Sequence, residues 1–523
     1  MELLKKNIHM DRVRFQALSQ ITLEDDLNVP DLKPDVSSLN FEKGMVLIDE
    51  VRPATDCVNV RGRLLFQVLY HTKEGGSCLV SLEGKLPFEE RINMQGVLSV
   101  DEVIVEGEIE DLNISIINSR KLNIQSVVTL NCRVEELYDV ELPIGIQGED
   151  AVEYRKAPCT VSQIAVSKKD IFRIKEEIGL PSNYPNIFQI LWSNVTVGDM
   201  DFRVMDGKIN LSGEIRIFVL YEGEGEEHPI RTFEHTLPVG GSIDCHGSRE
   251  GMIADIRCSI SPQDHGQPEI TIKPDFDGEE RSFGVDLVLD ILMKLYAEES
   301  MEVLTDIYGV TKEVEAVTEQ AKLCRLLARV NGKTRLNERV RVKGGAYGIL
   351  QLLHSEGKIF IEEQEVVPEG IHVSGSLQLD VMFITGNDEM PYGSIQEQIP
   401  YEYTLEVAGI TPEDLGMVRG ETEQLQVTML DGEEMDVKAI LSFSTIVFQN
   451  VCMQLIKDAE ITELDSTVLA GLPGMAVYVV KPGDHLWNIG KKYYVPVDSL
   501  RRINKLEKDE LVPGQKLLIV KGL

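Results

Sequence analysis

Three stretches of the sequence share one pattern: VRGRLLFQVLY at residues 60–70, LSGEIRIFVLY at 211–221 and VSGSLQLDVMF at 373–383. In each, an apolar residue lies two positions before a glycine. Apolar residues then follow at every second position until an aromatic residue ends the run. This period of two is typical of a β-strand with one face on a core. The stretches are separated by domain-sized distances, so the sequence predicts one β-rich fold repeated three times.

Other segments repeat around these strands. Turn signals at 118–119, 277–278 and 431–432 predict hairpins, and each is followed by a long alternating strand. Each copy opens with a shared segment, at 29–36, 180–187 and 342–349, although the third lacks the prolines of the other two. We therefore expect copies at 14–145, 160–310 and 320–456, with a helix at 314–328 between the last two. A linker at 457–475 precedes a small domain at 476–521.

Composition and charge narrow the function classes. The formal net charge of −35 argues against nucleic acid and against anionic lipid, because both are bound through Lys and Arg. Residues 481–521 differ, with nine Lys or Arg and five Asp or Glu. This contrast between a basic end and an acidic body can steer partner choice or self-association.

The N-terminal sequence and the cysteine pattern predict a cytoplasmic protein. The N-terminal residues lack the apolar run of a signal peptide, and charges interrupt the most apolar stretch at 283–297, so we expect neither export nor a membrane span. Eight cysteines are scattered singly without a C-x-x-C pair, which favours reduced thiols over a zinc site or a disulfide framework.

Residues 478–520 predict a βααβ module. A short strand meets Pro482-Gly483, Asp484 is placed to cap a helix, and a second helix and strand follow. We expect Trp487 to lie in the module's core. The motifs YVVKPGDHLW, Ile503-Asn504 and PGQKL closely resemble a LysM domain.

The resemblance implies a binding groove for N-acetylglucosamine polymers between two loops. Mapped onto this chain, the loops consist of Gly483, Asp484, His485 and Leu486, and of Leu511, Val512 and Pro513. His485 departs from the family pattern, where a small hydroxyl residue is usual. The charged run at 507–510 is a second departure, and both weigh against glycan binding.

The repeated unit resembles the SPOCS domain of spore-coat proteins, through LPSNYPNI at 180–187 and the strands that end in Leu-Tyr. Three such domains followed by LysM are similar to the SipL family. This resemblance implies a coat-assembly scaffold in the mother-cell cytoplasm, at the forespore surface. It also implies that LysM docks on a SpoIVA-like coat ATPase, with other coat proteins as further partners. The alternative is a peptidoglycan- or chitin-type glycan anchor in the cortex or wall.

Catalytic motifs do not emerge from the sequence. There is no H-E-x-x-H, G-x-S-x-G or P-loop, so we expect no enzyme and no cofactor. Cys245 and His246 are neighbours in sequence, but strand neighbours point to opposite faces. The acidic run at 275–280 could hold calcium, yet a hairpin turn explains it as well, and we expect no metal. The glycines at 221–227 lie among carboxylates that would repel a phosphate.

Overall fold

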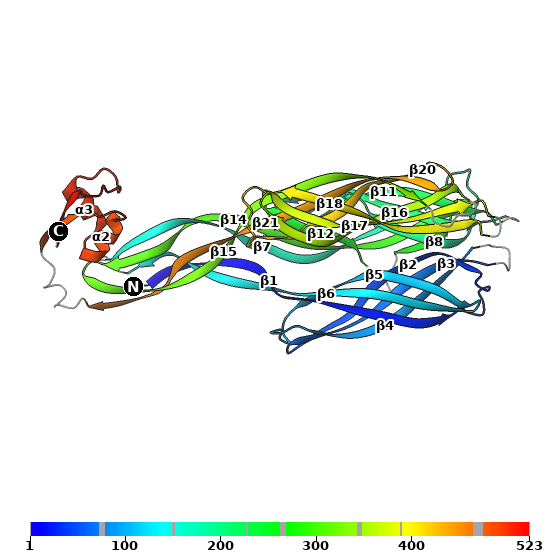
Figure 1. Cartoon of the computed structure of the whole chain (residues 1–523), viewed down its shortest axis with the longest axis horizontal. Helices are drawn as coiled ribbons and strands as arrows, with labels where there is room; N and C mark the ends of the chain where they lie inside the picture. Colours follow the sequence, from blue (N-terminus) through cyan, green and yellow to red (C-terminus); the bar gives the residue numbers. More distant parts are fainter. Residues whose placement is uncertain are drawn as a thin grey trace.

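The computed structural model describes residues 2–72, 79–148, 152–225, 228–261, 268–341, 348–387, 390–463 and 474–521. The molecule is elongated, with three β-rich lobes at one end, a stalk of long strands, and a small helical module at the other end (Figure 1). The mainly β fold predicted from the alternating patterns is confirmed. Among the described residues, no helix is long and apolar enough to span a membrane.

The first repeat is built around one very long antiparallel strand pair. β1 runs alongside β6 from the pair Glu2–Gln147 to the pair Asn28–Lys121, and β5 extends this sheet. A second sheet has the order β2-β3-β4, and its middle strand is the glycine-centred stretch of the first copy. The strands of this repeat are β1 (Glu2–Asn28), β2 (Ser38–Ala54), β3 (Cys57–His71), β4 (Leu79–Asn93), β5 (Val103–Asn118) and β6 (Lys121–Gln147).

The other two repeats follow the same plan. In each, the first strand pairs along its length with the last strand, and the glycine-centred stretch is the middle strand of a separate sheet. The second repeat consists of β7 (Val152–Gly179), β8 (Ile187–Val197), β9 (Asp201–Met205), β10 (Lys208–Gly223), β11 (Ile230–Asp244), β12 (Ile253–Ile260), β13 (Glu269–Pro274) and β14 (Glu280–Gly309). The third consists of β15 (Lys312–Arg341), β16 (Ile349–Val367), β17 (Gly370–Thr385), β18 (Tyr392–Glu406), β19 (Leu415–Gly416), β20 (Arg419–Met429) and β21 (Glu434–Glu463).

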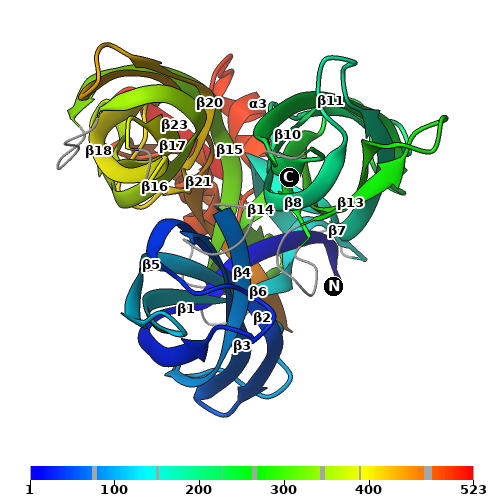
Figure 2. The same cartoon turned by 90° about the vertical axis from the view of Figure 1, so that its right-hand side faces the viewer.

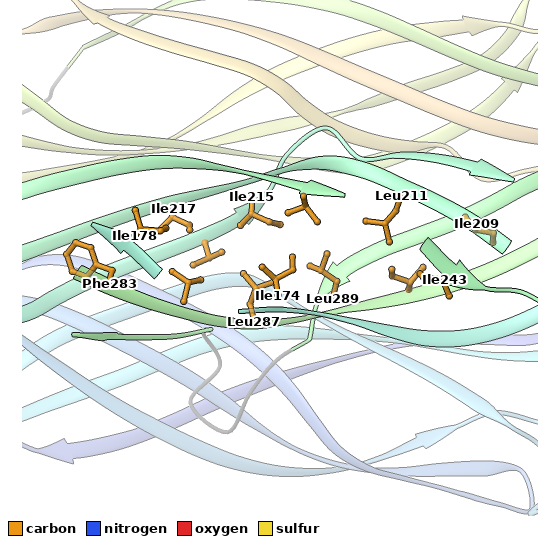
Figure 3. Packing of buried hydrophobic residues seen from close by; sticks show 14 of the residues in the cluster. Ile174, Ile178, Ile209, Leu211, Ile215, Ile217, Ile243, Phe283, Leu287 and Leu289 are labelled. Carbon is orange, nitrogen blue, oxygen red and sulfur yellow. The ribbon is translucent and has the colours of Figure 1, made fainter. Parts of the chain in front are cut away.

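The core of each lobe lies between its two sheets. In the second repeat, Ile215 and Ile217 of β10 and Leu287 and Leu289 of β14 belong to one buried cluster (Figure 3). Their exposed fractions are 3% or less. Because alternate side chains of a strand share a face, the period of two in the sequence becomes this two-sheet packing.

Beyond the lobes, the three long strand pairs continue as two-stranded ribbons and form the stalk. The ribbons pack face to face around apolar layers, and each layer takes one residue from each repeat. Two such layers are Met10, Val161 and Leu323, and Leu142, Val303 and Leu455. Viewed from the lobe end, the repeats surround a common axis (Figure 2). The chain therefore has an approximate threefold symmetry within a single molecule.

The structure corrects one element predicted from the sequence. The expected helix at 314–328 is wrong, because these residues belong to the strand β15, which pairs with β21 from the pair Lys312–Glu463 onward. Its Glu, Gln, Ala, Lys and Leu residues have good helix propensity, but pairing with a partner strand overrides that weak local preference. The three predicted hairpin turns are confirmed, between β5 and β6, β13 and β14, and β20 and β21.

The predicted domain bounds remain predictions, and the long strands run past them. β1 begins before residue 14, β7 before 160 and β15 before 320. The first seven residues of the expected linker 457–475 are still part of β21, while 464–473 lie outside the described residues. Most of the third opening segment, 342–347, also lies outside them.

Candidate functional site

The terminal module has the predicted βααβ order. It consists of β22 (Met475–Val479), α2 (Leu486–Tyr493), α3 (Val497–Asn504) and β23 (Lys516–Val520), with β22 and β23 paired antiparallel. Both helices pack an apolar face onto one side of this two-stranded sheet. The buried core consists of Val480, Leu486, Ile489, Val495, Leu500, Leu517 and Ile519.

The two loops predicted to form a groove lie next to each other. The N–H of Val480 donates to the carbonyl of Gln515 at 2.9 Å, and the N–H of Gly514 donates to the carbonyl of Val480 at 2.8 Å. Gly483 and Gly514, one in each loop, both have a φ of +87°, which glycine adopts without strain. Two Pro-Gly turns are thus fixed side by side at one end of the sheet.

The seven predicted site residues have different surroundings. Gly483, His485, Val512 and Pro513 are exposed, with Val512 at 67%. Leu511 and Asp484 are half-buried. Leu486 is 2% exposed and belongs to the core, so it is unavailable to a ligand in this conformation. The exposed surface of the groove is therefore narrower than the sequence mapping indicates.

Asp484 does not cap α2 as predicted. Its Oδ2 instead accepts hydrogen bonds from the backbone N–H of Lys481 and from the hydroxyl of Tyr478, both at 2.8 Å. These two bonds, the backbone one first, lower the pKa of the Asp484 carboxyl. The helix N-cap is His485, whose side chain makes no capping bond. Asp484 thus stabilises the turn before α2. Within the described part of the chain, no side chain caps α2, because His485 stands where the family usually has a small hydroxyl residue.

Trp487 corrects another expectation, because it lies on the module's surface against the stalk. Its indole N–H donates to Oδ2 of Asp306 at 2.7 Å, and its ring meets the edge of the Tyr308 ring with centroids 4.9 Å apart. The guanidinium of Arg155 lies over the indole, 5.7 Å from its centroid. Asp306 and Tyr308 belong to the end of β14 and Arg155 to the start of β7, so α2 docks on the second repeat.

Further polar contacts complete this docking surface. Nζ of Lys491 lies 2.6 Å from Oδ1 of Asp306, and the hydroxyl of Tyr308 donates to the carbonyl of Val495 at 2.9 Å. Burial would raise the pKa of Asp306, but the bonds from Lys491 and Trp487 and the Lys491 charge lower it overall. Gly490 lies at the closest approach, since a Cβ there would be 2.7 Å from the Tyr308 hydroxyl.

Sequence reasoning missed this docking surface altogether. Asp306 and Tyr308 close a strand far upstream of the module, and nothing in their local pattern distinguishes them from other strand ends. The one sequence feature that agrees with this docking is the contrast in charge between a basic module and an acidic body. Lys491 of the module and Asp306 of the body form an ion pair of this kind.

The other residues considered as candidate sites in the sequence have structural surroundings. Cys245 is buried while His246 is exposed, so the two side chains face apart. Oδ1 of Asp275 accepts the N–H groups of Asp277 and Glu279, which closes the β13–β14 turn. Within the described ranges, no three His, Cys, Asp or Glu side chains gather as metal ligands. The first three residues of the acidic run 221–227 belong to β10, with Tyr221 and Glu222 buried, and residues 226–227 of the connection to β11 lie outside the description.

Comparison with known protein families agrees with this architecture. A model described as "SipL, SPOCS domain" matches residues 21–117, 186–264 and 348–430, one segment in each lobe. A LysM domain model matches residues 478–520, which is the βααβ module. No solved structure matches the chain.

Curated relatives match over short stretches only. A putative sporulation-specific glycosylase, YdhD of Bacillus subtilis (strain 168), is 47% identical over 45 residues, 9% of this chain and 11% of that protein. A probable endopeptidase p60 of Listeria grayi is 54% identical over 41 residues, 8% of each chain. The chain thus spans about a tenth of the length of these relatives, and the matched stretches are about as long as the LysM segment.

The family matches fall on the units that the structure separates. Each SPOCS match includes the sheet that holds the glycine-centred strand, and the LysM match covers the docked module. The chain belongs to the SipL-like proteins, with three SPOCS domains followed by a LysM domain.

Proposed function

We propose that this protein is a non-enzymatic scaffold for assembly of the spore coat. In this role the three SPOCS repeats form one elongated body and LysM is the docking end. The observation that carries the proposal is the fixed placement of LysM at one pole of the body. There α2 is docked on the stalk, while Val512, His485 and Pro513 remain exposed. SPOCS and LysM are also families without catalytic activity of their own.

The partner we propose is a SpoIVA-like ATPase of the coat's basement layer, bound by LysM at the forespore surface on the mother-cell side. Residues 481–521 carry an excess of positive charge, which suits an acidic protein surface. His485, whose side chain makes no capping bond, and the charged residues 507–510 depart from the pattern of glycan-binding LysM domains. These departures favour a protein ligand over a sugar ligand.

A second candidate, a glycan anchor in the cortex or wall, has one observation in its favour. The two groove loops are held side by side by the Val480 hydrogen bonds, as a glycan-binding groove requires. The similarity to a putative sporulation-specific glycosylase and to a probable endopeptidase is consistent with either candidate, because LysM modules accompany many kinds of protein.

Calorimetric titration of the full chain separates the two candidates. We expect micromolar binding, about −8 kcal/mol, to the SpoIVA-like protein and no heat with N-acetylglucosamine oligomers. Val512→Glu should weaken partner binding, because it places a carboxylate in the exposed loop. Val100→Glu is the matched control, since Val100 is 86% exposed on the first repeat, and should leave binding unchanged.

Two outcomes would count against the scaffold. Glycan binding that Val512→Glu abolishes, without partner binding, would establish the anchor instead. In sporulating cells, a chain lacking residues 474–523 should lose its position at the forespore surface. Unchanged position of that truncated chain would contradict a docking role for LysM.

A further inference from the structure

Three polar side chains meet on the threefold axis of the lobes, one from each repeat. Nζ of Lys43 lies 2.9 Å from Oδ1 of Asn194 and 2.7 Å from Oε2 of Glu356. Nδ2 of Asn194 donates to the same Oε2 of Glu356 at 2.8 Å. We call this closed set of hydrogen bonds the axial triangle. Asn194 is 4% exposed, and the side chains of Lys43 and Glu356 are 27% and 24% exposed.

The members of the axial triangle occupy equivalent positions in the three repeats. Lys43 pairs with Gln67, Asn194 with Phe218 and Glu356 with Asp380, across the strand pairs β2–β3, β8–β10 and β16–β17. Those three partners each stand five positions after the glycine of their repeat. One structural position thus holds a cation, a neutral amide and an anion.

Beside the triangle lies an apolar layer in which all three repeats contribute the same kind of side chain. Its equivalent residues are Leu69, Leu220 and Met382, which are 2%, 0% and 3% exposed. They pack in one cluster with Phe41 and Trp192. Such a layer favours association of three repeats but does not distinguish among them.

Ion pairs also join the first repeat to the second and the second repeat to the third. Lys294 of the second repeat lies 3.1 Å from Oδ2 of Asp11 in the first. Arg419 of the third lies 2.6 Å from Oδ1 of Asp255 in the second. The charges that bind one repeat to the next therefore differ from interface to interface.

We propose that the axial triangle makes each repeat's axial face fit only the two other kinds of repeat, so that a threefold assembly takes one repeat of each kind, the set that a single chain supplies. Three like repeats would place three Lys, three Asn or three Glu at one point. The first and last combinations bring like charges together in a partly buried place, which is strongly unfavourable. The partner that fits each face is a SPOCS repeat with the complementary polar group.

Stability alone does not account for the triangle. Replacing partly buried ionic groups with apolar side chains of similar size is often neutral or stabilising, whereas a single buried polar residue can determine which chains associate. The apolar layer already supplies attraction between the repeats. The triangle then selects among arrangements that this layer would tolerate.

Full-length variants with two different affinity tags, produced in the same cells, test the proposal. The readouts are the fraction of one tag that copurifies with the other and the urea unfolding midpoint. In the apolar variant Lys43→Met/Asn194→Leu/Glu356→Met, we expect a midpoint no lower than that of the parent and a several-fold rise in copurification. A copurified fraction equal to the parent's in this folded variant would overturn the proposal.

Charge reversal gives a second, independent arm. Lys43→Glu and Glu356→Lys should each lower the urea unfolding midpoint, because like charges then meet where the first and third repeats come together, and the double variant should restore the midpoint because the pair is rebuilt with opposite polarity. A double variant no better than the single ones would overturn the proposal. Arg63 and Asp49 form an ion pair within the first repeat, 2.7 Å apart, and reversing that pair is the matched control.

Discussion

Asp380 shows how the crowded axis changes the chemistry of a single residue. It lies on β17 across from Glu356, and burial together with the charge of Glu356 raises the pKa of its carboxyl to about 6. The folded chain therefore holds a proton there up to about pH 6, whereas the unfolded chain releases it near 3.8. The free energy of unfolding should fall as pH rises through that window.

We expect Asp380→Asn to remove this loss. The variant should unfold with about 1–3 kcal/mol more free energy than the parent at pH 8, and with no such gain near pH 3.5. Urea unfolding at the two pH values measures the difference. Glu402→Gln, at an exposed position on the adjacent strand β18, is the control and should have the same stability relative to the parent at both pH values. An equal gain for Asp380→Asn at both pH values would mean that ionisation is not its cause.

Helix α2 is the element whose docking decides where LysM points. We expect Gly490→Ala to weaken that docking, because a Cβ would lie 2.7 Å from the Tyr308 hydroxyl. The chain has two tryptophans, and Trp192 is 1% exposed in the lobes. In a Trp192→Phe background, emission therefore reports on Trp487 alone and should shift to longer wavelength as the indole enters water.

The control for this substitution is Gly474→Ala, since no atom lies within 4 Å of a Cβ at that exposed position. It should leave the emission of Trp487 unchanged. An unshifted spectrum for Gly490→Ala would mean that the docking tolerates an added methyl group.

Elements were predictable where their own sequence determines them. The glycine-centred strands follow from a period of two, and the LysM helices follow from a motif within fewer than fifty residues. The strand at residues 314–328 was not predictable, because its form depends on partners in β21 that are more than a hundred residues away. The docking of Trp487 on Asp306 was unpredictable for the same reason. It is a contact between two surfaces, and the local sequence of either surface contains no pattern that identifies the other.

At the scale of the whole molecule, the stalk core joins the three repeats into one unit. Leu142 is fully buried there, beside Val303 and Leu455 of the other repeats. We expect Leu142→Ala to cost about 2–5 kcal/mol of unfolding free energy, because it opens a cavity in a packed layer. Hydrogen exchange should quicken in the ribbons of all three repeats.

Leu137→Ala is the matched control, since Leu137 lies on the same strand and is 63% exposed. It should change stability by less than about 0.5 kcal/mol. Faster exchange confined to the first repeat in Leu142→Ala would contradict a shared core. The sequence predicted three similar domains but not this union, because the equivalence of Leu142, Val303 and Leu455 becomes contact only through the threefold arrangement.

The long strand pairs also determine how the molecule carries force. Every repeat begins and ends at the LysM pole, and its ribbon runs from there into the lobe along the molecular axis (Figure 1). A pull between the LysM module and the lobes acts along the strands and loads many hydrogen bonds in parallel. A pull between the N-terminus and LysM acts at one pole and opens the ribbons one bond at a time. The protein should therefore resist a high force in the first direction and unfold at a low force in the second.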